Sequence, residues 1–162
     1  MTRQEPLPNW AEIVAILDAE RKQGKKIITT NGVFDLLHIG HVRYLQAARA
    51  LGDILVVGIN SDACTRRLKG ENRPFVPEKE RAEMLLALRC VDYVVLFEED
   101  TPEHLLGVLR PHIHTKGGDY DVEAMPETAV VRKHGGEVKT LPFVAGHSTT
   151  TLAKLIADRV ER

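Results

Sequence analysis

The sequence of 162 residues has few cysteines, no long apolar run and no excess of either charge. Its two cysteines, Cys64 and Cys90, are far apart and form no CxxC pair, which favours two ordinary thiols in a reducing compartment. No apolar stretch approaches the length of a membrane span, and the polar N-terminus lacks signal-peptide features, so we expect a cytoplasmic protein without a membrane partner. The formal net charge of -1, with both signs interspersed, gives no basic stripe for nucleic acid.

The length favours one domain with a well-buried core. Residues 1–8 are expected to form a flexible tail, and residues 9–24 an N-terminal helix that Asn9 caps and Gly24 ends. Trp10 lies in register with the apolar stripe of this helix, which favours packing in the core over stacking on a base.

Strand and helix patterns alternate along the rest of the chain. The nearly continuous apolar run at residues 53–60 is typical of a parallel strand covered on both faces. Further strands are expected to end near residues 30, 96, 116 and 143, with helical patterns between them. The alternation predicts an α/β, Rossmann-like fold, a parallel sheet of about five strands with helices on both faces. The loops at the carboxyl ends of the strands should then meet in one crevice.

The stretch TTNGVFDLLHIGH, residues 29–41, carries the strongest functional signal. It reads as the end of a strand, a turn and the start of a helix, where unpaired N–H groups and the helix dipole favour an anion. Gly32 and Gly40 remove side chains where a phosphate would approach the backbone. His38 and His41 are three residues apart and should share one helix face. The pattern predicts an oxyanion site for a phosphoryl group, which we favour over two histidines that merely cap and solvate a helix.

Such a site is suited to transfer at the α-phosphorus of a nucleoside triphosphate. Preorganised donors stabilise the charge that grows on the phosphoryl oxygens in the transition state. No side-chain nucleophile is needed, because a phosphate monoester is already largely a dianion at neutral pH.

Other polar groups follow the later strands. Asn60, Ser61 and Asp62 end the second strand; for Ser61 or Asp62, capping of the next helix and ligand contact are equally good interpretations. Lys69 and Arg73 lie in a basic loop that is either solvated surface or reaches a triphosphate or an anionic substrate.

Residues 112–150 contain further polar residues at the ends of predicted strands and at a helix start. His112 and His114 would share a strand face, but no further ligand has a familiar metal-site spacing, so no metal site is predicted. Lys116, followed by two glycines, offers a cation and close backbone access to an anion. The hydroxyl residues 148–150 open the last helix, and we favour binding of the β- and γ-phosphates over redundant capping.

The segment GVFDLLHIGHVRYLQ, residues 32–46, resembles the first motif of the HxGH (HIGH-type) nucleotidyltransferases, which include cytidylyltransferases and pantetheine-phosphate adenylyltransferases. Class I aminoacyl-tRNA synthetases share HIGH, but this chain has no KMSKS-like segment. Later segments, including RLKG, KGGDY and STT, are similar to D-glycero-β-D-manno-heptose 1-phosphate adenylyltransferases over roughly residues 25–158.

This resemblance implies a single nucleotidyltransferase domain over residues 1–162 that transfers AMP from ATP to heptose 1-phosphate. The products would be ADP-heptose and pyrophosphate, Mg²⁺ would bind with ATP, and the pathway would lead to lipopolysaccharide core sugars. The resemblance is also compatible with a homodimer. It implies catalytic roles for His38, His41 and Lys69; nucleotide binding by Asn31, Gly32, Val33, Phe34, Asp35, Gly40, His41, Lys116, Gly117, Asp119, Ser148, Thr149 and Thr150; and substrate binding by Asn60, Asp62 and Arg73.

Two positions depart from related patterns. Phe143 stands where glycerol-phosphate cytidylyltransferases typically have arginine, and His147 stands where heptose enzymes often have a smaller or apolar residue. The alternatives are therefore a CTP-dependent cytidylyltransferase acting on glycerol 3-phosphate or another polyol phosphate, and a non-catalytic nucleotide-binding subunit. Intact His38, His41 and Lys69 argue against the second alternative.

Overall fold

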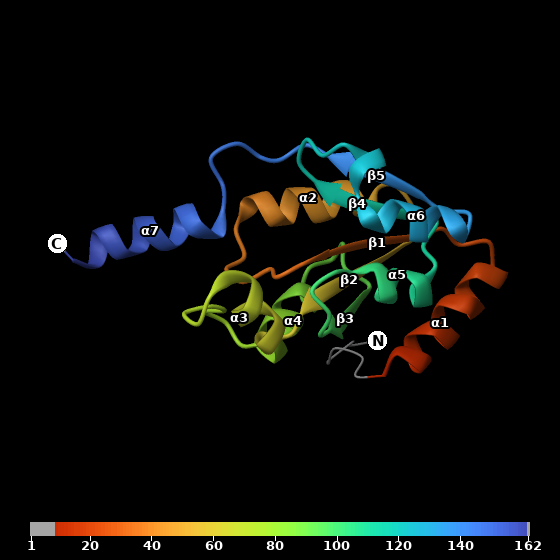
Figure 1. Cartoon of the computed structure of the whole chain (residues 1–162), viewed down its shortest axis with the longest axis horizontal. Coiled ribbons are helices and arrows are strands. Elements are labelled where there is room, and N and C mark those ends of the chain that lie inside the picture. The colour runs from red at the N-terminus through yellow and green to blue at the C-terminus, as the bar shows by residue number, and fades with distance from the viewer. Residues whose placement is uncertain (1–8, 162) are drawn as a thin grey trace.

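The computed structural model describes residues 9–161 and is built on a five-stranded parallel sheet with strand order β3-β2-β1-β4-β5 (Figure 1). The strands are β1 (Ile27–Gly32), β2 (Ile54–Asn60), β3 (Tyr93–Phe97), β4 (Ile113–Gly117) and β5 (Glu137–Leu141). The helices are α1 (Trp10–Lys22), α2 (Ile39–Arg49), α3 (Asp62–Lys69), α4 (Glu78–Leu86), α5 (Glu103–Leu109), α6 (Pro126–Lys133) and α7 (Thr149–Val160), with a 3-10 turn η1 (Val122–Ala124). The predicted Rossmann-like α/β fold is confirmed; the tail predicted for residues 1–8 lies outside the described residues.

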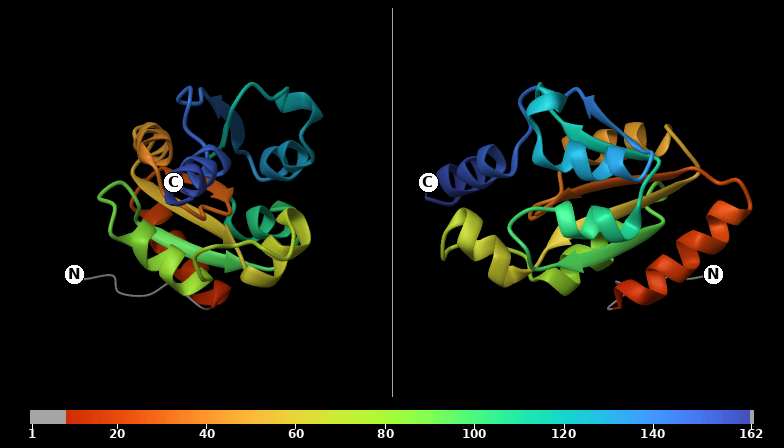
Figure 2. Two further views of the ribbon diagram at one scale, coloured as in Figure 1. Left: turned by 90° about the vertical axis from the view of Figure 1, so that its left-hand side faces the viewer. Right: turned by 45° about the vertical axis from the view of Figure 1, so that its right-hand side comes forward.

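Helices cover both faces of the sheet (Figure 2). On one face, α2 and α4 pack over β1 and β2 through residues such as Leu45 and Leu85. On the other face, α1 and α5 pack through Ile13, Leu17 and Leu105. All seven residues of β2 are buried, as its apolar run predicts for a central parallel strand. No helix among residues 9–161 is long and apolar enough to cross a membrane.

The helix at the N-terminus begins where the sequence predicts. Asn9 caps α1, and its side-chain oxygen accepts a hydrogen bond from the Ala11 N–H at 2.8 Å. Trp10 packs against the core of this face, and its indole N–H donates to the Leu96 carbonyl at 3.0 Å. The prediction that Trp10 packs in the core is confirmed.

A buried arginine joins the carboxyl ends of β1 and β2. Arg81 of α4 has 1% of its surface exposed and donates to the carbonyls of Val76, Val33 and Asn60 at 2.9, 2.6 and 2.9 Å. It also donates to the Asp62 carboxylate at 2.8 Å. A guanidinium stays charged in proteins, so each lost partner would leave a buried polar group unpaired.

Replacing Arg81 should therefore destabilise the fold strongly. We expect Arg81→Met to lower the free energy of unfolding by about 3–5 kcal/mol, because three carbonyls and a carboxylate lose their donor. Urea denaturation measures this change. Arg89→Met, at an exposed position just beyond α4, is the matched control and should change stability by less than about 0.5 kcal/mol. Equal losses in the two variants would contradict the prediction.

A second buried polar group holds β1 against β4. His114 is fully buried, and its Nδ1 lies 2.8 Å from the Thr29 hydroxyl on the neighbouring strand. Burial, with a smaller contribution from the charge of Lys116, lowers the pKa of His114 to about 3. The predicted strand starts one residue later than expected, at Ile113, so His112 precedes it and accepts a hydrogen bond from the Ile27 N–H.

This buried imidazole should make stability depend on pH. The unfolded chain protonates His114 near pH 6.5 and the folded chain only near pH 3, so its contribution is complete above pH 6.5 and is lost as the pH falls. Between pH 7 and pH 5 the loss should be about 2 kcal/mol in the free energy of unfolding. The Asn side chain of His114→Asn can still form a hydrogen bond but does not titrate. Over the same pH range, urea denaturation should therefore show a fall in the free energy of unfolding that is about 2 kcal/mol smaller for this variant than for the wild type. The same fall in both proteins would refute this.

Candidate active site

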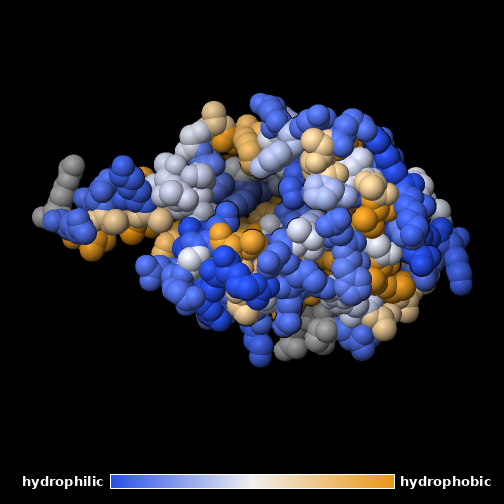
Figure 3. Space-filling model, in the orientation of Figure 1, coloured by the Kyte–Doolittle hydropathy of each residue, from blue (hydrophilic) through white to orange (hydrophobic). Residues whose placement is uncertain are grey.

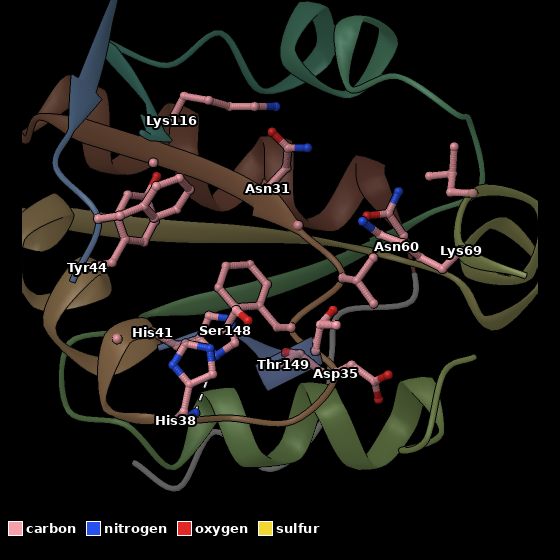
Figure 4. Close-up of a pocket in the computed structure, with 18 of the residues that line it drawn as sticks. Asn31, Asp35, His38, His41, Tyr44, Asn60, Lys69, Lys116, Ser148 and Thr149 are labelled. Atoms are coloured by element: carbon pink, nitrogen blue, oxygen red, sulfur yellow. Dashed lines mark hydrogen bonds between the residues drawn. The ribbon is translucent and has the colours of Figure 1, made fainter. Parts of the chain in front are cut away.

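A cavity of about 670 Å³ opens at the carboxyl ends of β1, β2 and β4 (Figure 4). All but two of the predicted site residues line it: Asn31, Gly32, Val33, Phe34, Asp35, His38, Gly40, His41, Asn60, Lys69, Arg73, Lys116, Gly117, Ser148, Thr149 and Thr150. Segments more than a hundred residues apart in sequence thus meet at one edge of the sheet, where parallel α/β folds bind ligands.

The two predicted residues that do not line the cavity have other surroundings. Asp62 pairs with the buried Arg81 behind the cavity, and Asp119 is exposed in the loop after β4. Ser61, not Asp62, caps α3, because its hydroxyl accepts a hydrogen bond from the Cys64 N–H at 3.1 Å. Asn60 lines the cavity, and its amide donates to Cys64 Sγ at 3.3 Å.

The two histidines of the HIGH motif stack on one another at the start of α2. Their ring centroids are 3.8 Å apart with 23° between the planes. His38 is the N-cap residue of α2, and its backbone N–H donates to His41 Nδ1 at 3.4 Å. Since Nδ1 accepts, a neutral His41 ring carries its proton on Nε2 and can donate it to a ligand.

The glycine between these histidines has a definite structural reason. A Cβ at Gly40 would lie 2.9 Å from the His38 ring and 3.1 Å from the Cβ of His147. Glycine at this position therefore lets the His38 ring lie close to the first turn of the helix. The sequence interpretation, which assigned Gly40 to phosphate access alone, missed this packing role.

Burial keeps both rings neutral. Burial, with a smaller contribution from the neighbouring His38, lowers the pKa of His41 to about 4. Burial also lowers the pKa of His38, with a contribution from His147, whose ring centroid is 6.2 Å away. At neutral pH the site therefore offers N–H donors without the desolvation cost of buried cations.

A buried carboxylate fixes the loop that follows α3. Although burial alone would raise it, the pKa of Asp35 is held below its usual range by the backbone N–H groups of Phe75 and Val76 and by the Arg73 guanidinium. The Asp35 carboxylate accepts from these N–H groups at 2.9 Å and from Arg73 Nε at 2.7 Å. Asp35 is 1% exposed, and its ion pair with Arg73 holds the guanidinium among the residues that line the cavity.

Tyr44 holds α2 against the sheet and was missed from the sequence. Its hydroxyl lies 2.8 Å from the Thr30 hydroxyl on β1 and donates to the Thr115 hydroxyl on β4 at 3.1 Å. The Thr115 hydroxyl in turn donates to the Thr29 carbonyl at 3.1 Å. This chain of hydrogen bonds sets the position of the helix that carries the histidines.

The last helix brings its N-terminus to the cavity and then projects from the body (Figures 1 and 3). The Ser148 hydroxyl caps α7 by accepting from the Thr151 N–H at 3.0 Å, and the Thr149 hydroxyl donates to the Leu36 carbonyl at 3.4 Å. The interpretation of Ser148 as a helix cap is therefore confirmed. Contact of residues 148–150 with phosphates stays a prediction.

The carboxylates of the cavity are already paired with cations. Asp35 bonds Arg73, Asp100 bonds Arg67, and Glu127 bonds Lys116. Among residues 9–161, no group of three or more His, Cys, Asp or Glu side chains is arranged to hold a metal ion.

The sequence of the chain is similar to that of a known protein family. A model described as cytidylyltransferase-like matches residues 29–154. The bifunctional protein HldE of Pelobacter propionicus is 54% identical over 153 residues, and HldE of Geobacter sulfurreducens is 53% identical over 148 residues. These matches cover 94% and 91% of this chain but 31% and 30% of the relatives, so the chain spans about a third of their length.

A solved structure agrees with this result. The crystal structure of the lipopolysaccharide core biosynthesis protein from Thermoplasma volcanium GSS1 is 32% identical, with a TM-score of 0.61, and the match covers 75% of this chain and 98% of that one. The family match begins in β1 and runs into α7, so it includes the stacked histidines and every strand end that lines the cavity. The resemblance seen in the sequence is confirmed, and the chain belongs to the cytidylyltransferase-like family.

Proposed function

We propose that the protein is an adenylyltransferase that transfers AMP from ATP to D-glycero-β-D-manno-heptose 1-phosphate, giving ADP-heptose and pyrophosphate. The stacked pair of His38 and His41 at the helix start is the observation that carries the phosphoryl-transfer part of the proposal. The sugar part is supported by the motif resemblance to heptose 1-phosphate adenylyltransferases and by the similarity to HldE proteins.

The reaction needs no side-chain nucleophile. An oxygen of the sugar phosphate attacks the α-phosphorus of ATP, the bond from the α-phosphorus to the bridging oxygen breaks, and pyrophosphate leaves with that oxygen. The His38 and His41 N–H groups stabilise the negative charge that grows on the α-phosphoryl oxygens. The backbone around Gly32 gives the phosphates close access to the chain.

The leaving pyrophosphate is proposed to lie near the start of α7. Thr149 and Thr150 line the cavity in the first turn of this helix, where backbone N–H groups favour an anion. Lys69, at the exposed end of α3, adds a positive charge from the opposite rim. Mg²⁺ bound to the triphosphate would neutralise phosphate charge, held by phosphate oxygens and water.

The histidine pair should be required for turnover. We expect His38→Ala and His41→Ala each to lower kcat by about 100- to 1000-fold, because each removes a donor to the transition state. ATP affinity, measured by calorimetry, and the thermal midpoint should change little. His134→Ala, at an exposed position that does not line the cavity, is the matched control and should keep full activity. Near-normal pyrophosphate release from both variants would refute the mechanism and favour a non-catalytic nucleotide-binding subunit.

A substrate panel should identify the reaction. We expect pyrophosphate release to be fastest with ATP and heptose 1-phosphate among the four nucleoside triphosphates and a set of sugar and polyol phosphates. Mass spectrometry of the product should show ADP-heptose. Faster release with CTP and glycerol 3-phosphate would transfer the assignment to the cytidylyltransferase alternative, against which Phe143 in the place of an arginine already argues.

A further inference from the structure

The wall of the cavity opposite the histidines carries a second polar group of residues, which the phosphoryl chemistry does not use. It consists of Asn31 at the end of β1, Lys116 in β4 and Glu127 in the first turn of α6. Figure 4 shows Asn31 and Lys116 on one side of β1 and His38 and His41 on the other. The cavity therefore has two chemically different walls.

The charge of this second wall is balanced. Lys116 Nζ lies 3.1 Å from the Glu127 carboxylate, and Glu127 is only 4% exposed. A lysine alone at this edge would attract a phosphate. With a buried carboxylate beside it, an incoming phosphate would meet like charge in a poorly solvated place, which costs binding energy. The pair therefore favours a polar ligand without charge.

The wall also has unused capacity for hydrogen bonds. Asn31 Oδ1 is buried and has no hydrogen-bond partner among residues 9–161. The Lys116 ammonium has three N–H donors, whereas a carboxylate such as Glu127 can accept several hydrogen bonds at once. Two acceptors beside one donor match hydroxyl groups, each of which both donates and accepts. Two hydroxyls on neighbouring carbons would fill such a site together.

We propose that Asn31, Lys116 and Glu127 form a subsite for the vicinal hydroxyl groups of a sugar ring, with Glu127 as the residue that selects for them. The inference rests on the proposed function and extends it to the part of the substrate that does not react. Two rings carry this chemistry in the proposed reaction, the ribose of the nucleotide and the acceptor sugar. The subsite holds one of them while the phosphates lie against the histidine wall.

The test compares two glutamate-to-glutamine variants. Glu127→Gln removes the charge that accepts the hydroxyls, and Glu123→Gln removes the charge of an exposed glutamate four residues away that pairs with Arg132. We expect Glu127→Gln to raise KM for either ATP or the acceptor by about tenfold or more, with kcat changed less than threefold. Glu123→Gln should leave both constants unchanged.

Substrates lacking single hydroxyls then identify the ring. Removing the hydroxyl that Glu127 binds should weaken the wild-type complex about tenfold but weaken the Glu127→Gln complex less, because the charge that strengthens this hydrogen bond is already lost. If this difference between wild type and variant is found with 2′-deoxy- or 3′-deoxy-ATP, the subsite binds the ribose. If it is found with deoxy analogues of the acceptor, the subsite binds the acceptor sugar. If the variant and the wild type lose affinity equally for every analogue, the proposal is wrong.

Direct binding separates this inference from the proposed function. Calorimetric titration with ATP, its deoxy analogues and the sugar phosphates reports the subsite even if no acceptor supports turnover; a lack of turnover would refute only the proposed reaction. Tighter ATP binding by Glu127→Gln, with no change in the response to deoxy analogues, would assign Lys116 to the triphosphate and overturn the subsite. If Glu127→Gln does not fold, Glu127→Asp takes its place, because it keeps the charge but moves it away from the ligand. Its loss of affinity for each deoxy analogue is then compared with that of the wild type.

Discussion

The site depends on the close stacking of two neutral imidazoles at the first turn of α2, where Gly40 has no side chain. Gly40 leaves room for the His38 ring, and His41 accepts the His38 backbone N–H. The Tyr44 hydroxyl fixes the helix that carries them to β1 and β4. The parallel sheet contributes by ending β1 beneath this turn, so that the rings face the cavity and not the core.

Much of this arrangement could be predicted from the sequence because its causes are local. The buried run of β2 has an apolar pattern typical of a central parallel strand, and the alternation of strands and helices then limits the topology. Residues 29–41 place the histidines, the glycines and the helix start within one short segment. Once all strands are parallel, loops far apart in sequence must meet at one edge, which is why most predicted residues line the cavity.

What the sequence did not reveal depends on contacts between distant segments. Asp35 lies in the strongest motif, but its bonds to Arg73 and to the backbone of Phe75 cannot be inferred without the fold. Glu127 looks like an ordinary helix-start glutamate, and only the packing of α6 beside β4 buries it against Lys116. Asp62 follows a strand as a ligand-binding residue would, yet the buried Arg81 takes its carboxylate.

The distribution of charge explains how one cavity can sort two kinds of chemical group. Each carboxylate that lines it is paired with a cation, so no wall presents an unbalanced negative charge to a triphosphate. The histidine wall gives donors that are neutral before the ligand arrives, and a bound phosphate would raise their pKa values and strengthen the same bonds. The Lys116–Glu127 wall carries no net charge that would attract a phosphate, because the ammonium and the carboxylate form an ion pair. In the proposed reaction, the phosphate groups would therefore bind on the side of α2, and uncharged hydroxyl groups would bind on the side of α6.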